Sequence, residues 1–324
     1  MSPAKPTLAL CIPAYNAAGF LGRLLASAKS QTEPFDEIWV YDDASKDNTS
    51  DLALGLGAQV IRGKVNAGCP HGKNSVAKAT QCDWIHFHDA DDVLEPNFVT
   101  SARSWMALPN GPDVVLFSYR AVDDRTGEQL YVRVFDADAL AADAVAYCIR
   151  EQINPFSGIY RRTPFLECGG WDEDPAVLAS EDQAGHMRMA LAGLRFAADP
   201  TVTVINHIRT GSMSDTVSAR CPSADYRIME KSWRLASPQL RPAFARRLWK
   251  IAGAAGAFLD WATADKSAAI ARHLDPNATI DGSKAFGALA RLAPRLALRL
   301  RERWIRLVRP QLRSKRQYHP NRAP

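Results

Sequence analysis

Short clusters of carboxylates are the residues of this sequence whose spacing most clearly suggests chemistry. The densest is Asp89-Ala90-Asp91-Asp92, where three carboxylates within four residues repel one another. A divalent cation would offset that repulsion, and Mg²⁺ or Mn²⁺ takes oxygen ligands and usually bridges to substrate phosphates. Taken alone, such a motif is more often an acidic turn with an N-capping aspartate. Whether the Asp89–Asp92 cluster binds a metal or only forms a turn therefore depends on which other polar residues lie beside it in the fold.

Two further polar clusters follow predicted strands. Asp42-Asp43-Ala44-Ser45-Lys46-Asp47 comes after the apolar run 37–41, and Pro13-Ala14-Tyr15-Asn16 comes after the run 8–12. Carboxylates in the first of these can accept hydrogen bonds from a base N–H or from ribose hydroxyls. The alternative is an Asx-rich turn that caps the next helix.

The elements that must position these clusters alternate between strand and helix. Helical spacing of apolar residues runs over 20–28 and 72–82, and another helix is expected to open near Pro96. The sequence pattern predicts strands at 8–12, 37–41, 59–62, 83–88 and 114–119. This alternation predicts an α/β domain with a mainly parallel sheet flanked by helices. Because parallel strands end at one edge of the sheet, we expect the polar clusters to line one cleft.

The C-terminal region differs in composition from the rest of the chain. The net charge is +5, but residues 241–324 hold 18 basic and 5 acidic residues, so the first 240 are net acidic. Helices are predicted at 242–273 and 284–309, with Pro294 kinking or dividing the second. An apolar stripe interleaved with arginines is formed there by Phe286, Leu289, Leu292, Leu296, Leu300, Trp304 and Leu307. Such a helix suits an anionic membrane surface, although the stripe could instead pack on the protein or form a dimer.

Length and composition exclude several classes of protein. The 324 residues, 47% of them apolar, are enough for a large core. We predict a catalytic domain at 1–240, a helical basic region at 241–309 and a disordered tail at 310–324. The longest apolar run, 251–259, is too short to span a membrane, and no secretory signal is evident. Six single cysteines suggest a reduced, cytoplasmic protein. The sequence has no basic, aromatic-rich stripe of the kind that binds nucleic acid, so we expect no nucleic-acid partner.

At this point the chain resembles the family 2 glycosyltransferases, which have the GT-A fold. The resemblance covers about residues 7–215 and rests on seven motifs in the family's order. These are Cys11-Ile12-Pro13-Ala14-Tyr15-Asn16, Asp42-Asp43-Ala44-Ser45-Lys46-Asp47, Asn66-Ala67-Gly68 with Gly72-Lys73-Asn74-Ser75, His88-Asp89-Ala90-Asp91-Asp92, Ser157-Gly158-Ile159-Tyr160-Arg161-Arg162, Gly169-Gly170-Trp171-Asp172-Glu173, and Glu181-Asp182. Each motif is weak alone, but seven in order are specific.

The resemblance implies inverting transfer of a sugar from a nucleotide-diphosphate donor, most commonly a UDP-sugar. It implies that Asp182 is the general base and that Asp91 holds Mn²⁺ or Mg²⁺. Contacts to the donor nucleotide are implied for Pro13, Tyr15, Asn16, Asp43, Lys73, Asp89 and Asp92. The chemistry fits, since a carboxylate must accept the acceptor hydroxyl's proton and a cation must neutralise the leaving diphosphate.

Several of these residues have a plain structural alternative. Glu181 and Asp182 are equally suited to a helix N-terminus, and Glu181 is also a candidate acceptor contact. His207 is a candidate metal ligand or a structural histidine. Trp171 could stack on a sugar or lie in the core, and Lys73 could meet phosphate or face solvent. We expect His86 and His88, which alternate along one strand, to be packed rather than to bind metal.

Departures from the family pattern narrow the function. The chain lacks the Gln-x-x-Arg-Trp motif and the transmembrane helices of processive synthases, which favours transfer of a single sugar. We expect the acceptor to be a glycan or a lipid-linked molecule in the synthesis of surface polysaccharide or lipo-oligosaccharide. Two other functions remain open. One is a sugar-nucleotide pyrophosphorylase, although the first loop lacks the expected Gly-rich pattern. The other is a membrane-surface adaptor with a vestigial nucleotide site.

Overall fold

The computed structural model describes residues 5–209, 218–280 and 284–314, which fall into two compact units. The sheet unit comprises Met1–Ala144, Ile153–Glu173 and Ala192–Thr210. The helical unit comprises Val145–Gln152, Asp174–Leu191 and Gly211–Pro324. These bounds differ from the division at residue 240 expected from composition, because three segments before it belong to the helical unit, namely Val145–Gln152, Asp174–Leu191 and residues 211–240.

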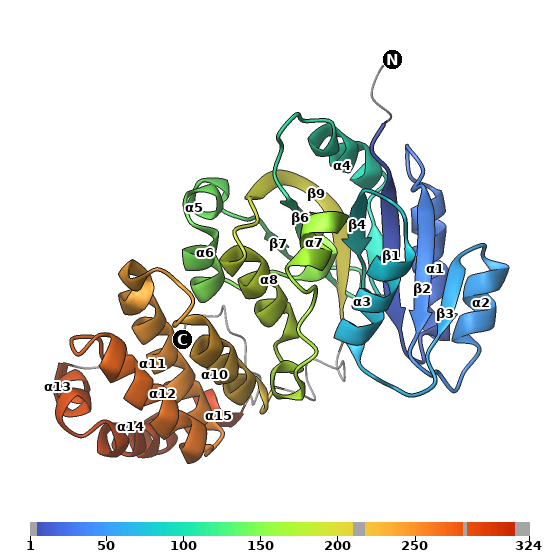
Figure 1. The fold of residues 1–324 in the computed structure, drawn as a ribbon. Coiled ribbons are helices and arrows are strands. Elements are labelled where there is room, and N and C mark those ends of the chain that lie inside the picture. Colours follow the sequence, from blue (N-terminus) through green and yellow to red (C-terminus); the bar gives the residue numbers. More distant parts are fainter. Residues whose placement is uncertain (1–4, 210–217, 281–283, 315–324) are drawn as a thin grey trace. The chain divides into compact units, whose positions relative to one another are not determined.

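The strands of the sheet unit form one continuous sheet (Figure 1). In the described residues they are β1 Leu8–Ala14, β2 Glu37–Asp42, β3 Gln59–Arg62, β4 Trp84–Phe87, β5 Val93–Leu94, β6 Val114–Asp123, β7 Gln129–Arg133, β8 Gly158–Arg161 and β9 Phe196–Ile208. Their order in the sheet is β3-β2-β1-β4-β8-β6-β9-β5. β7 pairs with the C-terminal half of β6.

The α/β architecture predicted from the sequence is confirmed, and the five predicted strands are all present. β3, β2, β1 and β4 pair in parallel, as does β6 with β9. The pairings of β4 with β8, β8 with β6, β5 with β9 and β6 with β7 are antiparallel. The sheet is therefore parallel in its first half and mixed beyond β4, where the sequence pattern was weakest.

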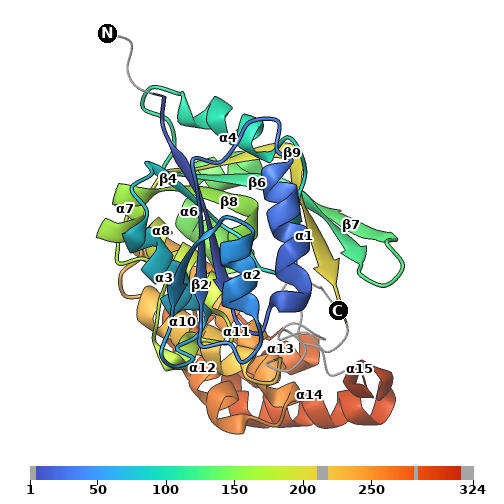
Figure 2. The same cartoon turned by 90° about the vertical axis from the view of Figure 1, so that its right-hand side faces the viewer.

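Helices cover both faces of the parallel half of the sheet. The sheet unit contains α1 Ala18–Lys29, α2 Thr49–Gly55, α3 Cys69–Ala79, α4 Phe98–Met106, α5 Ala137–Ala142 and α7 Arg162–Glu167, with a 3₁₀ turn at Pro155–Ser157. Figure 2 shows α1 and α3 on opposite sides of β1 and β2. The residues that α1 buries, Leu21, Leu24, Leu25 and Ala28, are those with helical spacing in the sequence. Since both faces are covered, β1 is apolar along most of its length.

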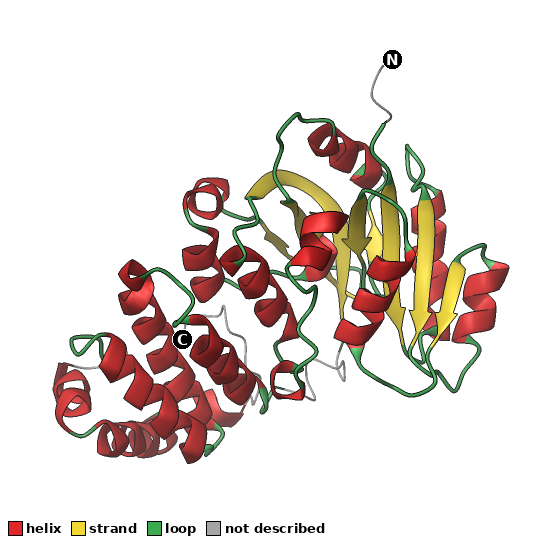
Figure 3. Ribbon diagram, viewed as in Figure 1, coloured by secondary structure: helices red, strands yellow, loops and turns green. Residues whose placement is uncertain are grey.

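The helical unit contains no strand among its described residues (Figure 3). Its helices are α6 Ala144–Arg150, which begins one residue before the unit, α8 Glu181–Leu191, α10 Cys221–Ser232, α11 Arg241–Ala257, α12 Trp261–Leu274, α13 Lys284–Leu292, α14 Pro294–Val308 and α15 Gln311–Ser314, with 3₁₀ turns at Pro175–Val177 and Pro238–Leu240. α13 ends and α14 begins at Pro294, so the predicted division there is confirmed. Part of the tail expected to be disordered is the helix α15, and residues 315–324 lie outside the described residues.

None of the described helices is both long enough and apolar enough to cross a bilayer. The apolar run 251–259 falls at the end of α11, where Ile251, Ala252 and Ala255 are buried.

Candidate active site

The ends of three neighbouring strands bring the predicted polar clusters together. β1 lies between β2 and β4, with Ala14 opposite Asp42 and Cys11 opposite Phe87. Beyond the strands, the Asp43 N–H donates to the Ala14 carbonyl at 2.8 Å and the His88 N–H donates to the Cys11 carbonyl at 3.0 Å. The loops after β1, β2 and β4 therefore leave the sheet side by side.

The loops after β1 and β2 are tied to each other by Asn16. Its backbone N–H donates to the Ser45 hydroxyl at 2.8 Å, and its side-chain carbonyl accepts from the Lys46 N–H at 2.8 Å. Asn16 and Ala44 both have positive φ, 50° and 61°, a conformation that asparagine tolerates better than most residues. Tyr15 is 46% exposed beside them, so its ring is accessible to a ligand. Asn16 therefore positions the loops after β1 and β2 relative to each other, and its contact with the donor stays a prediction.

The two aspartates at the end of β2 have different environments. Asp42 accepts from the Ser45 N–H at 2.9 Å and from the Ser50 hydroxyl, which makes it a turn and helix anchor. Asp43 accepts from the Ala67 N–H at 2.7 Å and the Gly68 N–H at 2.8 Å. A carboxylate has about four lone-pair sites, so Asp43 keeps acceptor capacity for a base N–H. The Asn66-Ala67-Gly68 motif thus orients the aspartate that was predicted to bind the donor.

The acidic loop after β4 is clamped to β9 by Asp92. Its carboxylate accepts from the Asn206 side-chain amide at 2.9 Å and from the His207 N–H at 2.8 Å. It is 2% exposed, and burial together with the charges of Asp89 and Asp91 raises its pKa well above the ordinary value. Both oxygens of Asp92 therefore help to hold the loop in place, and its contact with the donor stays a prediction.

Asp91 lies in a network of opposite charges. Its carboxylate pairs with Arg209, and its backbone carbonyl accepts from Arg23 at 2.8 Å. Arg23 also pairs with Asp124 at 3.1 Å, and His207 Nδ1 lies 2.9 Å from the same Asp124 oxygen. The structure thus brings Asp91 and the histidine of the sequence prediction into one cluster with three residues that the sequence analysis did not select.

A divalent cation fits the chemistry of this cluster. No group of three or more His, Cys, Asp or Glu in the described part of the chain forms a complete metal cage. Mg²⁺-type sites commonly use one or two carboxylates, with substrate phosphates and water as the other ligands. Asp91, which is partly exposed, and its neighbour Asp89 offer such hard oxygen donors.

His207 is partly committed to another partner. Burial and the nearby Arg23 charge lower its pKa, and the Asp124 carboxylate opposes that effect. A neutral imidazole can bind a metal, but its Nδ1 faces Asp124.

Lys73 and Trp171 are packed together inside the sheet unit. Lys73 is 2% exposed, and its ammonium lies 5.0 Å from the centroid of the Trp171 ring. The indole packs edge-on against Phe87 and Tyr160, with centroids at 5.5 and 5.9 Å. A sugar or phosphate would reach them only if these side chains moved. The structure therefore favours the core alternative for Trp171 and contradicts the solvent-facing alternative for Lys73, whereas phosphate binding by Lys73 stays a prediction.

The motif that contains Lys73 and the motif that contains Trp171 are joined by hydrogen bonds of Asn74. Asn74 accepts from the Trp171 N–H at 2.9 Å and donates to the Trp171 carbonyl at 3.0 Å and to Glu173 at 2.6 Å. Gly170 has φ of +64°, and a Cβ there would overlap the Asn74 side-chain oxygen. These contacts account for the Gly-Gly-Trp-x-Glu pattern by packing and hydrogen bonding.

His86 and His88 form a buried pair, as the sequence predicted. His86 Nδ1 lies 2.8 Å from the Gly158 carbonyl and must donate to it. Its Nε2 then accepts from His88 Nδ1 at 2.9 Å. Burial lowers the pKa of His86 to about 3, and burial beside His86 lowers that of His88 well below its ordinary value. Both imidazoles are therefore neutral at pH 7.

Glu181 and Asp182 lie in the helical unit, in the first turn of α8. Acidic residues favour that position because of the helix dipole. The His186 Nδ1 donates to the Asp182 backbone carbonyl at 2.8 Å, one turn along the helix. This placement fits the helix-terminus interpretation, and the catalytic interpretation of Asp182 stays a prediction.

Arg23, Asp124, Arg209 and Asn206 are the site residues that sequence reasoning missed. Arg23 is on α1, and Asp124 follows β6 in a region with no recognisable motif. Only Arg209 had a local signal, since it stands two residues after His207.

Comparison with known proteins decides the family of this site. The family described as glycosyl transferase family 2 matches residues 9–166, which include β1, β2, β4 and the loops that follow them. Residues 9–166 form a family 2 glycosyltransferase domain. An uncharacterized glycosyltransferase of Rickettsia typhi is 28% identical to this chain over 131 residues, which are 40% of this chain. The matched region spans only 41% of that relative.

Solved structures show that the fold of this glycosyltransferase domain extends over most of the chain. Residues 1–349 of S. aureus TarS superpose with a TM-score of 0.62 at 18% identity, covering 93% of this chain and 91% of that one. A Pyrobaculum calidifontis mannosyltransferase, solved with GDP-Man and Mn²⁺, gives 0.60 at 18% identity and covers 97% and 85%. These likenesses establish a GT-A type fold with a helical C-terminal region.

Proposed function

We propose that this chain is an inverting glycosyltransferase that moves one sugar from a nucleotide-diphosphate donor to a hydroxyl of a glycan or lipid-linked acceptor. The observation that carries the proposal is that Asp43 follows β2 and that Asp89 and Asp91 follow β4, on either side of β1 within a family 2 domain. A uridine donor is supported by TarS, which has been solved with UDP-GlcNAc. Surface polysaccharide or lipo-oligosaccharide synthesis is the pathway that suits single-sugar transfer.

Donor binding follows from the positions of these side chains. Asp43, oriented by the N–H groups of Ala67 and Gly68, accepts from the base, and the exposed Tyr15 flanks it. Asp89 faces the ribose and Asp91 the diphosphate. A divalent cation at Asp91 supplies neutralisation of the charge that develops on the leaving diphosphate. Arg209, which pairs with Asp91, adds positive charge at the same place.

Asp182 is the proposed general base. Inversion by a single displacement needs one carboxylate to accept the acceptor hydroxyl's proton, and it needs no enzymic nucleophile. The first turn of α8 holds this carboxylate on a regular helix rather than on a loop.

The test measures UDP release from UDP-sugars with Mn²⁺, alongside calorimetric UDP binding, for wild type and Asp182→Asn. We expect transfer to fall by about 10²–10⁴-fold and UDP binding to stay within about twofold. Asp138→Asn is the matched control, because it neutralises an aspartate in the first turn of another helix, α5. Near-wild-type transfer by Asp182→Asn would overturn the base assignment, and failure to bind any nucleotide diphosphate would overturn the proposed function.

A further inference from the structure

The helix α14 carries an apolar stripe on its exposed side. Leu296 is 50% exposed, Leu300 38%, Trp304 45% and Leu307 82%. At about 100° per residue, these four side chains fall within about 80° of one another around the helix. Leu292, the last residue of α13, is 84% exposed. Four large apolar side chains in one row on a helix surface indicate an interaction site rather than scattered exposure.

The stripe is not the side by which α14 packs on the helical unit. Leu298 and Ile305 are buried on the opposite side of the helix, and the buried Ala297 lies at the edge of the stripe, about 20° from Trp304. α14 packs on α11 and α12, and it also packs on α13. Phe286, also predicted in the stripe, is instead partly buried on α13, with its ring 6.4 Å from that of Trp304. Packing on the protein therefore explains the buried side of α14, but it does not explain why the side that carries the stripe is exposed.

Arginines outnumber carboxylates along α14, and Arg295, Arg299, Arg303 and Arg306 form an arginine row beside the stripe. Residues 294–313 contain seven arginines and one glutamate. Arg295 and Arg299 share Asp265, at 3.5 and 3.0 Å. Arg306 and Arg313 share Glu302, each at 2.7 Å. The surface beside the stripe consequently has a surplus of positive charge.

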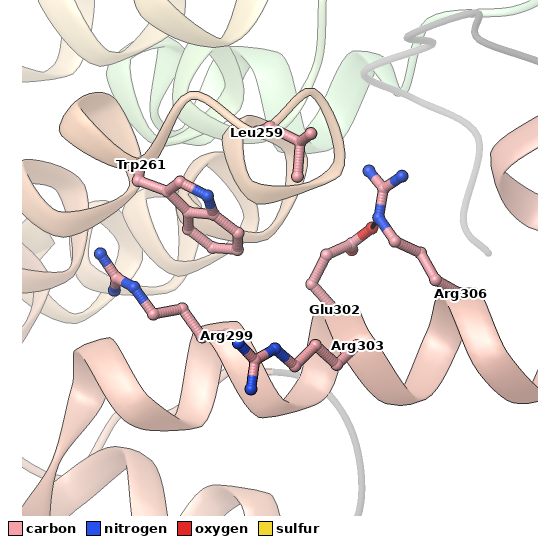
Figure 4. A pocket seen from close by; sticks show the side chains of 6 residues that line it. All are labelled: Leu259, Trp261, Arg299, Glu302, Arg303 and Arg306. Carbon is pink, nitrogen blue, oxygen red and sulfur yellow. Dashed lines mark ion pairs between the residues drawn. The ribbon is translucent and has the colours of Figure 1, made fainter.

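A cavity of about 300 Å³ opens beside this arginine row (Figure 4). It is lined by Leu259, Trp261, Arg299, Glu302, Arg303 and Arg306. Figure 4 shows the three guanidinium groups around the space between α14 and Trp261, with Glu302 already paired to Arg306. Three cations and one anion give the cavity a net positive charge. Arg303 lies between the cavity and the stripe on the helix surface.

We propose that this face of α14 docks on the surface of an anionic phospholipid bilayer. Leu296, Leu300, Trp304 and Leu307 enter the headgroup–acyl boundary, and the arginine row and the cavity bind lipid phosphates. An apolar stripe with an interfacial tryptophan beside a row of arginines has the chemistry of a helix that lies in the membrane interface. A second copy of the chain fits less well, because a two-fold interface would place the arginine row of one copy against that of the other.

The experiment is co-sedimentation of the full chain with vesicles of phosphatidylcholine, with and without phosphatidylglycerol. We expect binding to the anionic vesicles only, and weaker binding between about 0.05 and 0.5 M NaCl, where the Debye length shortens severalfold. Arg303→Glu should weaken partitioning by about 20-fold, since each charge near the surface is worth about fivefold. Leu296→Gln with Leu300→Gln should weaken it by tenfold or more.

Controls come from the same unit. Arg272→Glu makes the same charge change on α12, and Leu235→Gln removes another leucine that is 75% exposed. Both should bind like wild type. Equal binding to neutral and anionic vesicles, or no binding by a folded protein, would overturn the proposal. So would a dimer, seen by light scattering, that the Leu296 and Leu300 substitutions dissociate. If inorganic phosphate abolishes sedimentation at constant ionic strength, the result would support a phosphate site in the cavity. If phosphate competes no better than NaCl at the same ionic strength, the phosphate site in the cavity would be overturned.

Discussion

Substitution of His86 should change how the stability of the sheet unit depends on pH. In an unfolded chain histidine titrates near pH 6.5. In the folded protein, burial lowers the pKa of His86 to about 3. Between these values the unfolded state binds a proton that the folded state does not, so stability is full above pH 6.5 and is lost as pH falls toward 3. From pH 7 to pH 5 the loss from His86 alone is about 2 kcal/mol.

The variant His86→Gln removes this titration while keeping a side-chain N–H for the Gly158 carbonyl. It should be less stable than wild type at pH 7, because His86 packs on Phe98 with ring centroids 4.1 Å apart. Its free energy of unfolding should nevertheless fall by about 2 kcal/mol less than that of wild type between pH 7 and pH 5. Urea denaturation followed by tryptophan fluorescence measures both quantities.

His273→Gln is the control, since His273 is an exposed histidine at the end of α12. It should retain the wild-type pH dependence. If wild type and His86→Gln lose the same free energy on acidification, His86 is not held neutral by burial, and the reasoning fails.

Three more outcomes follow from the structure. Asp91→Ala should weaken UDP binding with Mn²⁺ much more than with chelator, and equal losses measured by calorimetry would show that Asp91 does not act through a cation. Gly170→Ala should destabilise the protein by about 1–3 kcal/mol in thermal or urea unfolding, because its φ is +64° and a Cβ overlaps Asn74; an unchanged midpoint would contradict this. Arg247→Leu removes a buried ion pair with Asp225 at 2.9 Å, so a loss of about 3–5 kcal/mol in the free energy of unfolding is expected, and a loss below about 1 kcal/mol would refute it.

The sequence was sufficient to predict the parallel strands and the convergence of their polar loops. Those predictions rest on local signals, namely short apolar runs followed by acidic turns, and the sheet places the loops together by simple geometry. The same signals were too weak beyond β4, where strands such as β8 and β9 pair in a mixed pattern that no local rule indicates.

Residues whose roles depend on distant partners were the ones that the sequence could not assign. Lys73 stands in the first turns of α3, where a lysine is usually solvated, but it is buried and its ammonium lies over the ring of the distant Trp171. Asp124 becomes a site residue through Arg23, about a hundred positions earlier in the chain. Composition placed a boundary at residue 240, whereas α8 joins the helical unit through contacts that composition does not reveal.

The acidic loop after β4 separates positioning from binding among its aspartates. Asp92 fixes the loop through Asn206 and the backbone of His207, and the adjoining β5 extends that hold by pairing with β9. Asp91 is partly exposed and paired with one arginine side chain, so its carboxylate can exchange partners without moving the backbone. Since a bound diphosphate attracts both a cation and a guanidinium, such an exchange would cost little reorganisation of the loop. Three neighbouring carboxylates, costly as a bare cluster, thereby become one buried anchor and two partly exposed groups.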